Sequence, residues 1–268
     1  MERINVKIDE TAEVSPEAVI GAGSEIGQYC QIGPGVELGE NTVVGNRVEI
    51  TGKTRLGDNN QIFTGAILGQ AASYSERRKQ LEGTDQDDNF DLIIGDNNII
   101  REYAIIYGGQ RIGVEKKPTE IGDSNFLMAY IQIKSGARLG SRITVANSSV
   151  LDEGCLIDDQ AFLAGLAYIP EETRIGRLAM VGACARIVDP LPPFLLADGN
   201  PAGVESMNVV GIRRADISRE AFSEIKKVYR KLSRENGDTP IKEMELETEE
   251  GRELQKFILE EVELHGRK

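Results

Sequence analysis

An aliphatic residue recurs at every sixth position through most of this chain, and no other feature constrains the fold as strongly. Isoleucine, leucine or valine occupies each such position in three runs, which extend from Ile8 to Leu68, from Ile94 to Ile106 and from Ile121 to Ile187. A repeat sustained over this length indicates a solenoid, in which one small structural unit is stacked many times.

A short strand followed by a tight turn accounts for a unit of six residues. Neither a helical period of 3.6 residues nor the two-residue alternation of an ordinary strand produces the pattern. If each aliphatic side chain points into a prism, three units close one coil, and each coil buries its aliphatic residues against the next. Small residues such as Gly21 after Ile20 suit a corner where the backbone turns sharply. The sequence therefore predicts a parallel β-helix, an all-β solenoid, over residues 1–190.

The register of six breaks twice, between Leu68 and Ile94 and between Ile106 and Ile121. We interpret residues 69–93 and 107–120 as inserted loops. Long excursions from a rigid scaffold are either functional or merely tolerated. We favour a functional role, because a smooth rod needs added segments to shape a site.

The pattern changes after Ile187. The prolines of "VDPLPPFLLADGNPAGV" remove backbone donors and end the coil. Beyond Ser218, which is placed to cap a helix, apolar residues recur on one helical face: Phe222, Ile225, Val228, Tyr229 and Leu232. We therefore expect a helical C-terminal domain over residues 191–268.

This tail concentrates positive charge in a chain whose net charge is −13. The basic residues are Arg213, Arg214, Arg219, Lys226, Lys227, Arg230, Lys231 and Arg234. They form either a solvated helix face or a docking surface for an acidic protein or for phosphates, because clustered cations speed the encounter with an anionic partner. The negative charge of the rest of the chain argues against nucleic-acid binding.

Composition excludes several other classes of protein. Cys30, Cys155 and Cys184 are widely spaced, with no CxxC motif and no histidine nearby, so we interpret them as small core residues rather than metal ligands or disulfide partners. No apolar run approaches the ~18 residues of a membrane helix, and the charged start "MERINVKIDE" is unlike a signal peptide. We expect a cytoplasmic protein without a metal site.

Three stretches resemble the UDP-N-acetylglucosamine O-acyltransferases of lipid A synthesis, and the resemblance covers nearly the full length. "IGDNNIIREYAIIYGG" is similar to the family's segment around the inserted loops, "SNFLMAYIQI" to its active-site coil, and "LPPFLLADGNPAGVESMNVVGIRRADISREAFSEIKKVY" to its passage into the helices. The resemblance implies a left-handed coil and a homotrimer with active sites between subunits. It also implies transfer of a hydroxyacyl chain from acyl carrier protein to a sugar 3-hydroxyl, without a cofactor.

In that family a histidine is the general base, but this chain has one histidine, His265, three residues from its end. Aligning "FLMAYIQIKSGARLG" with the family's active-site coil puts Ser135 at the position of that histidine and Gly136 at the position of an orienting aspartate. Tyr107, Gln132 and Pro170 stand at the family's other histidines. The imidazole mechanism is therefore absent, and we leave the catalytic residue unassigned.

Other residues offer partial replacements. A serine hydroxyl needs a base of its own, and Lys134 should point away from Ser135, because neighbouring strand residues alternate faces. The remaining candidates are Tyr107 and Tyr130 as hydrogen-bond donors to an oxyanion, and Asp123 or Glu102 as a base if burial raises the carboxyl pKa.

The residues that would hold a nucleotide are retained. Asn200, Arg213 and Arg214 match family positions that contact the UDP portion, and arginine suits a diphosphate because it donates paired hydrogen bonds. Gln132 and Tyr107 complete the expected substrate-binding set. The alternative is that Asn200 forms a turn and the two arginines are simply solvated.

Three functions follow from these observations. The first is acyl transfer to a UDP-amino sugar, a reaction that needs little help from a general base if the acceptor is a 3-amino sugar. The second is a non-catalytic trimer that binds UDP-sugar or acyl carrier protein, the latter through the basic C-terminal helix. The third, an acetyl- or succinyltransferase that uses coenzyme A, is disfavoured by the missing histidines and by the helical tail. A carbonic anhydrase of this fold is excluded, since it needs three histidine ligands.

Overall fold

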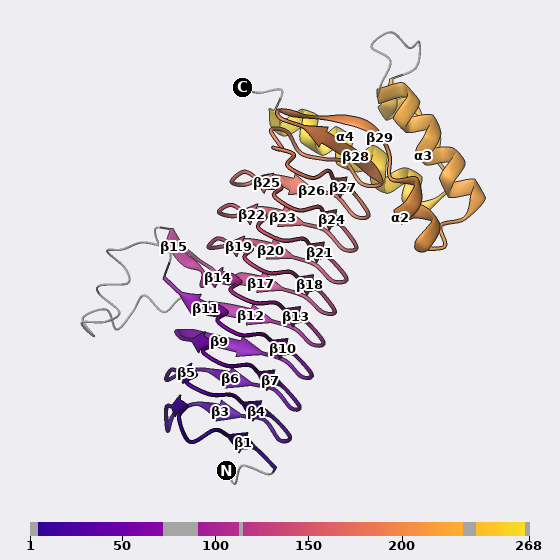
Figure 1. Ribbon diagram of the computed structural model, residues 1–268. Coiled ribbons are helices and arrows are strands. Elements are labelled where there is room, and N and C mark those ends of the chain that lie inside the picture. The colour runs from indigo at the N-terminus through magenta and orange to yellow at the C-terminus, as the bar shows by residue number, and fades with distance from the viewer. Residues whose placement is uncertain (1–4, 72–90, 113–114, 233–239, 266–268) are drawn as a thin grey trace.

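The six-residue units fold as short parallel strands joined by tight turns, and three units make each coil of a left-handed β-helix (Figure 1). This computed structural model describes residues 5–71, 91–112, 115–232 and 240–265. The coils stack into a rod that carries the helices at its C-terminal end (Figure 1). The prediction of an all-β solenoid followed by helices is confirmed.

Three sheets form the faces of the rod. Sheet A contains β1 (Lys7–Ile8), β4 (Glu25–Ile26), β7 (Val43–Val44), β10 (Gln61–Ile62), β13 (Ile99–Ile100), β18 (Phe126–Leu127), β21 (Thr144–Val145), β24 (Phe162–Leu163), β27 (Met180–Val181), β28 (Leu195–Gly199) and β29 (Ala202–Met207). Sheet B contains β2 (Glu13–Val14), β5 (Gln31–Ile32), β8 (Glu49–Ile50), β11 (Ile67–Gln70), β14 (Ile105–Tyr107), β19 (Gln132–Ile133), β22 (Val150–Leu151) and β25 (Tyr168–Ile169). Sheet C contains β3 (Val19–Ile20), β6 (Glu37–Leu38), β9 (Lys53–Leu56), β12 (Asp91–Ile94), β17 (Thr119–Ile121), β20 (Arg138–Leu139), β23 (Leu156–Ile157) and β26 (Arg174–Ile175).

Most strands have two residues, of which the first points outward and the second inward. In β24, Phe162 is 37% exposed and Leu163 is fully buried. Leu163 lies in register with Val145 of the coil before and Val181 of the coil after. Fully burying one such side chain contributes roughly 1.5–3 kcal/mol, so the aliphatic stack stabilises the rod only when neighbouring coils are present.

The turns between strands explain why small residues lie between the regularly spaced aliphatic residues. The third residue after the inward aliphatic has a positive φ at nearly every corner, for example +71° at Gly136 and +65° at Gly154. Glycine adopts this left-handed conformation without strain. Glu172, with a φ of 53°, shows that a larger residue is accepted where the stack holds the turn in place.

Two excursions leave the coil and return to it in register. Contacting residues of neighbouring coils are usually 18 positions apart, but 38 across the first excursion and 27 across the second. Most of the first, residues 72–90, lies outside the described residues. The second contains an antiparallel pair, β15 (Gln110–Ile112) and β16 (Glu115–Lys117), between β14 and β17.

The C-terminal segment begins where β28 and β29 pair antiparallel at the end of sheet A. It continues with α2 (Val209–Arg214), α3 (Arg219–Leu232), the 3-10 helix η1 (Ile241–Glu243) and α4 (Glu249–His265). Ser218 caps α3 as predicted, since its Oγ accepts a hydrogen bond from the N–H of Ala221 at 3.0 Å. Of the helices that the structure describes, none has the length and apolar character needed to cross a membrane.

Candidate active site

Ser135 and Gly136 form the corner between β19 of sheet B and β20 of sheet C. Both are buried, although turn residues of a solenoid usually face solvent. The second excursion passes close to this corner: the N–H of Gly136 donates to Oγ1 of Thr119 at 3.0 Å. A Cβ added to Gly136 would lie 3.8 Å from Cβ of Lys117, an ordinary contact. The excursion therefore encloses the corner.

Acidic residues occupy the same corner in the next two coils. Glu153 and Gly154 join β22 to β23, and Glu171 and Glu172 join β25 to β26. Backbone hydrogen bonds hold these corners in register: the N–H of Gly154 donates to the carbonyl of Ser135 at 3.1 Å, and that of Glu172 to the carbonyl of Glu153 at 2.8 Å. The edge of the rod between sheets B and C thus presents a column of carboxylates.

A cleft of about 80 Å³ lies along this edge. Its lining residues are Lys117, Ser135, Gly136, Glu153, Gly154, Glu171 and Glu172. Ser135 is 1% exposed, and its Oγ has no hydrogen-bond partner among the described residues. Buried hydroxyl groups are nearly always hydrogen-bonded, so this one is able to bond to water or to a polar ligand.

The predicted residues Tyr107 and Gln132 lie on the face that leads to this edge. Tyr107 ends β14 and Gln132 begins β19, both half-buried on the outer side of sheet B. Nζ of Lys134, the residue before Ser135, lies 5.7 Å from the centroid of the Tyr107 ring. Pro170 directly precedes Glu171 on the same edge. The structure thus places Tyr107, Gln132, Ser135, Gly136 and Pro170 in one region.

Three residues considered as replacements for the histidine lie on other edges of the rod. Tyr130 and Glu102 occupy corners that follow sheet A, and Asp123 a corner that follows sheet C. Tyr130 stacks on Tyr103 with ring centroids 5.3 Å apart. Hydrogen bonds from Arg101 hold the pKa of Glu102 below its usual value, which makes it a poorer base. These three residues do not line the cleft at Ser135.

Three acids that do line the cleft, Glu153, Glu171 and Glu172, were missed by the sequence analysis. The sequence carries a signal for two of them: Glu153 and Glu171 follow Ser135 at intervals of one coil, 18 residues, and therefore share its turn position. The one histidine of the chain, His265, lies at the end of α4 in the C-terminal segment.

The nucleotide-binding candidates lie on two neighbouring elements. Asn200 is exposed in the turn that joins β28 to β29, and Arg213 and Arg214 are exposed in the last turn of α2. Asn208 positions α2, because its side chain accepts a hydrogen bond from the N–H of Gly211 and donates one to the carbonyl of Leu178. The α2 helix is thereby tied to the last coils of the rod.

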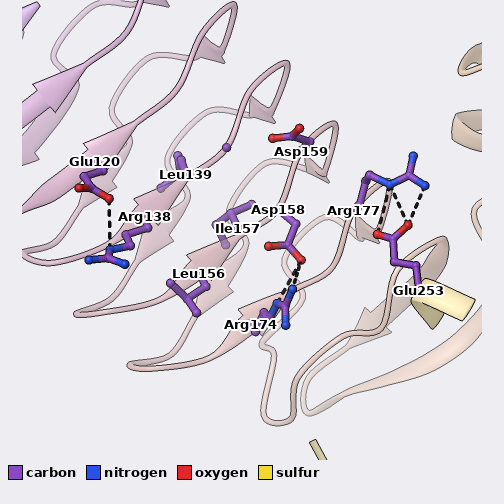
Figure 2. Close-up of a pocket in the computed structure, with 11 residues that line it drawn as sticks. Glu120, Arg138, Leu139, Leu156, Ile157, Asp158, Asp159, Arg174, Arg177 and Glu253 are labelled. Carbon is purple, nitrogen blue, oxygen red and sulfur yellow. Dashed lines mark hydrogen bonds and ion pairs between the residues drawn. The ribbon is translucent and has the colours of Figure 1, made fainter. Parts of the chain in front are cut away.

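A larger cleft of about 550 Å³ lies between sheet C and α4, and most of its charged side chains form ion pairs (Figure 2). Figure 2 shows Arg138 with Glu120, Arg174 with Asp158 and Arg177 with Glu253, at 3.3, 3.0 and 2.7 Å. Burial raises the pKa of Asp158, and the Arg174 guanidinium partly offsets this effect. Arg177–Glu253, together with Arg174–Glu260 at 3.7 Å, joins α4 to the rod, so this cleft is a structural junction.

Known proteins match both parts of the chain. The family described as UDP-N-acetylglucosamine O-acyltransferase, domain 2, matches residues 191–263, and the bacterial transferase hexapeptide repeat matches residues 17–52. An acyl-(acyl-carrier-protein)–UDP-N-acetylglucosamine O-acyltransferase of Aliarcobacter butzleri is 38% identical over 225 residues, which cover 84% of this chain and 83% of that protein.

Two further similarities agree with this match. A protein of the same name from Gloeothece citriformis is 32% identical over 180 residues, or 66% of this chain. The aligned region spans only 60% of that relative's length. The solved structure of a UDP-N-acetylglucosamine acyltransferase from Campylobacter jejuni superposes with a TM-score of 0.84 and 29% identity, over 95% of this chain and 96% of that one.

Proposed function

Since this chain belongs to the UDP-N-acetylglucosamine O-acyltransferase family, we propose that it transfers an acyl chain from acyl carrier protein to UDP-N-acetylglucosamine. The observation that carries the proposal is the match to the Aliarcobacter enzyme, which includes both the β-helix and the C-terminal segment. Short repeat matches alone would support the fold and not the reaction.

The test is turnover by the purified full-length chain. Acyl carrier protein charged with hydroxyacyl thioesters of several lengths is incubated with UDP-N-acetylglucosamine, and the acylated sugar nucleotide is measured by mass spectrometry. Product formation supports the proposal. Absence of product with every acyl length, together with tight binding of the sugar nucleotide, would instead support a non-catalytic binder.

A UDP-sugar with a 3-amino group is the second candidate acceptor. The names of the relatives favour the hydroxyl, whereas the absence of any histidine from residues 1–264 favours a nucleophile that needs less help from a base. A neutral amine attacks a thioester more readily than an alcohol does. The same assay with the amino sugar nucleotide decides between the two acceptors.

Binding of the nucleotide is assigned to the two arginines of α2 together with Asn200. Arg213 and Arg214 are exposed, and neither forms an ion pair with any residue that the structure describes. Two unpaired guanidinium groups on one helical turn can each donate paired hydrogen bonds to a diphosphate. Gln132 and Tyr107 are assigned to the sugar or acyl portion, because they lie on the face that leads to Ser135.

Acyl carrier protein is expected to dock on α3. Ala221, Ile225 and Val228 are the buried side of this helix, while four cations on its other sides are exposed, namely Arg219, Lys226, Lys227 and Arg230. Carrier proteins that are acidic would be drawn to this surface, and the attraction should weaken with added salt. The reaction also implies a cytoplasmic location, where acyl carrier protein and nucleotide sugars are made.

A homotrimer is supported by the outer surface of sheet A. From β7 to β27 its outward side chains carry no charge: Val43, Gln61, Ile99, Phe126, Thr144, Phe162 and Met180. The corresponding row on sheet C contains Glu37, Arg55, Glu120, Arg138 and Arg174. An uncharged, largely apolar row along a rod is the kind of surface that a second copy of the chain buries.

A further inference from the structure

Acyl transfer places a negative charge on the thioester carbonyl oxygen before the thioester breaks. Hydrogen-bond donors fixed around this oxygen are usually the largest single contribution to catalysis of such a step. Residues 1–264 contain no histidine to take up the proton of the acceptor. Groups that stabilise the charge on the carbonyl oxygen are therefore the more important part of a site in this chain.

The hydroxyl of Ser135 is a buried donor in the cleft between sheets B and C. Ser135 is 1% exposed, and its Oγ bonds to no atom of the described residues. A buried hydroxyl that lacks a hydrogen bond costs free energy, and it can donate one bond. Because Ser135 lines the cleft, a carbonyl oxygen bound there can accept this bond in place of water.

Lys117 brings a second donor to the same cleft. It is the last residue of β16 in the second excursion, it is exposed, and it is the one lysine or arginine among the lining residues. It forms no ion pair with any residue that the structure describes. An ammonium group has three N–H donors and no acceptor, so it suits an oxygen that gains negative charge.

The backbone holds the two donors beside one another. One coil further on, the corner N–H of Gly154 donates to the carbonyl of Ser135. The second excursion replaces the corner before Ser135, and the N–H of Gly136 donates instead to Oγ1 of Thr119 at 3.0 Å. Thr119 is fully buried and lies two residues after Lys117. A Cβ added to Gly136 would lie 3.8 Å from Cβ of Lys117, so both donors belong to segments that are bonded together.

The charge of the cleft favours a carbonyl group over an anion. Its lining contains one lysine and three glutamates, so a phosphate or a free carboxylate would meet a net negative surface. A thioester carbonyl is neutral when it binds and becomes negative only during the attack. Donors placed for that charge bind the transition state more strongly than the substrate, and such a difference accelerates a reaction.

On the basis of the proposed function, we propose that the Ser135 hydroxyl and the Lys117 ammonium group form the oxyanion site of this enzyme. Each donates a hydrogen bond to the thioester carbonyl oxygen. The acceptor oxygen or nitrogen attacks the carbonyl carbon, and the π electrons of the carbonyl move onto its oxygen. When the carbonyl forms again, the carbon–sulfur bond breaks, and the departing thiolate takes the proton of the acceptor. No cofactor, oxidant or reductant enters the balance.

The test measures steady-state kinetics of the full-length protein with the acyl carrier thioester and whichever acceptor the parent uses. Lys117→Met and Ser135→Ala should each lower kcat by roughly 10²–10³-fold, the effect of removing one donor to an oxyanion. The KM for the sugar nucleotide should stay unchanged in both variants, because neither donor contacts the nucleotide.

Two further variants separate charge from structure. Lys117→Arg should recover most of the loss seen in Lys117→Met, because a guanidinium group also donates charged hydrogen bonds. Lys256→Met removes an exposed lysine of α4 that does not line the cleft, and it should keep the kcat of the parent. Circular dichroism and sedimentation of each variant confirm that the fold is intact.

The outcomes distinguish the oxyanion site from the function on which it rests. A parent without turnover on either acceptor would refute the proposed function and the assignment of both donors with it. In an active parent, an unchanged kcat in Lys117→Met or in Ser135→Ala would overturn the oxyanion site alone. A raised KM for the sugar nucleotide with kcat unchanged, or a Lys117→Arg variant as slow as Lys117→Met, would overturn it as well.

Discussion

Single residues in this protein take their roles from their position within the coil. The same turn position holds a serine at 135 and glutamates at 153 and 171, so one edge of the rod changes from a buried hydroxyl to an exposed carboxylate within three coils. Likewise Cys155 lies at an inward position and is fully buried, whereas Cys184 occupies a turn and is exposed. Chemical reactivity therefore varies between residues of identical type.

The cysteines give a direct measure of this difference. Burial, with a smaller effect from Asp152, raises the pKa of Cys155 to about 12, and Cys30 is also buried with a raised pKa. Because the thiolate is the reactive form, iodoacetamide at about pH 8 should alkylate Cys184 alone in the folded protein. Mass spectrometry identifies the labelled residues, and all three should react in urea. Rapid labelling of native Cys155 would contradict its placement in the core.

Arg213 tests the assignment of the nucleotide site. Arg213→Ala should weaken binding of UDP-N-acetylglucosamine by about 1.5–3 kcal/mol, the contribution of a hydrogen bond to a charged group. Arg230→Ala, which removes an exposed arginine from α3, is the matched control and should leave affinity unchanged. Isothermal calorimetry measures both. Equal affinity of Arg213→Ala and parent would mean that the arginines of α2 are merely solvated.

At the scale of elements, two arginines of sheet C and the turn after it fasten α4 to the rod. Arg177 donates to both carboxylate oxygens of Glu253, with the shortest contact at 2.7 Å, and its guanidinium lies over the Phe194 ring. Arg174 lies over Phe257 in the same way, 4.8 Å from the ring centroid. Planar guanidinium groups suit this combination of paired hydrogen bonds and stacking.

The Arg177–Glu253 pair should therefore contribute measurably to stability. Glu253→Ala is expected to lower the free energy of unfolding by about 1–2 kcal/mol, because the pair is two-pronged and mostly buried. Lys256→Ala breaks an exposed pair with Glu260 on the same helix and should cost less than about 0.5 kcal/mol. Urea unfolding followed by the helical circular dichroism signal compares them. Similar losses of unfolding free energy in both variants would show that the Arg177–Glu253 pair contributes no more to stability than the exposed Lys256–Glu260 pair.

At the scale of the whole molecule, the uncharged outer row of sheet A is the surface expected to join copies of the chain. A mass near three times the 29.3 kDa of one chain should be found by sedimentation equilibrium. A neighbour packed along this row would also shield the sheet from water and give the rod lateral support that a single file of coils lacks.

In β24, a substitution of the outward residue is expected to change the oligomeric state, and one of the inward residue to change the stability. Phe162→Asp places a charge on the outer row and should shift the protein towards monomers while the chain stays folded. Leu163→Ala removes a fully buried side chain and should lower the free energy of unfolding by about 2–5 kcal/mol. Sedimentation and thermal unfolding report the two effects. A trimer that Phe162→Asp leaves intact would move the interface to another face.

The sequence alone determined the solenoid, because a period of six aliphatic residues can be buried only by stacking coils of three units. It also determined the helical tail and the cap at Ser218 from local periodicity and hydrogen-bonding chemistry. These features depend on residues close together in the chain or on a repeat that runs through it.

The grouping of side chains in the cleft at Ser135, in contrast, emerged only from the tertiary structure. Glu153 and Glu171 meet Ser135 because an edge of the rod stacks residues one coil apart, and Lys117 joins them because the second excursion folds back on that edge. Tyr130 and Asp123 are closer to Ser135 in the sequence than Glu153 is, yet the turns place them on other edges of the rod. The path of the backbone around the three faces decides which side chains share a cleft. The six-residue pattern is the same on every face, so it does not reveal this grouping.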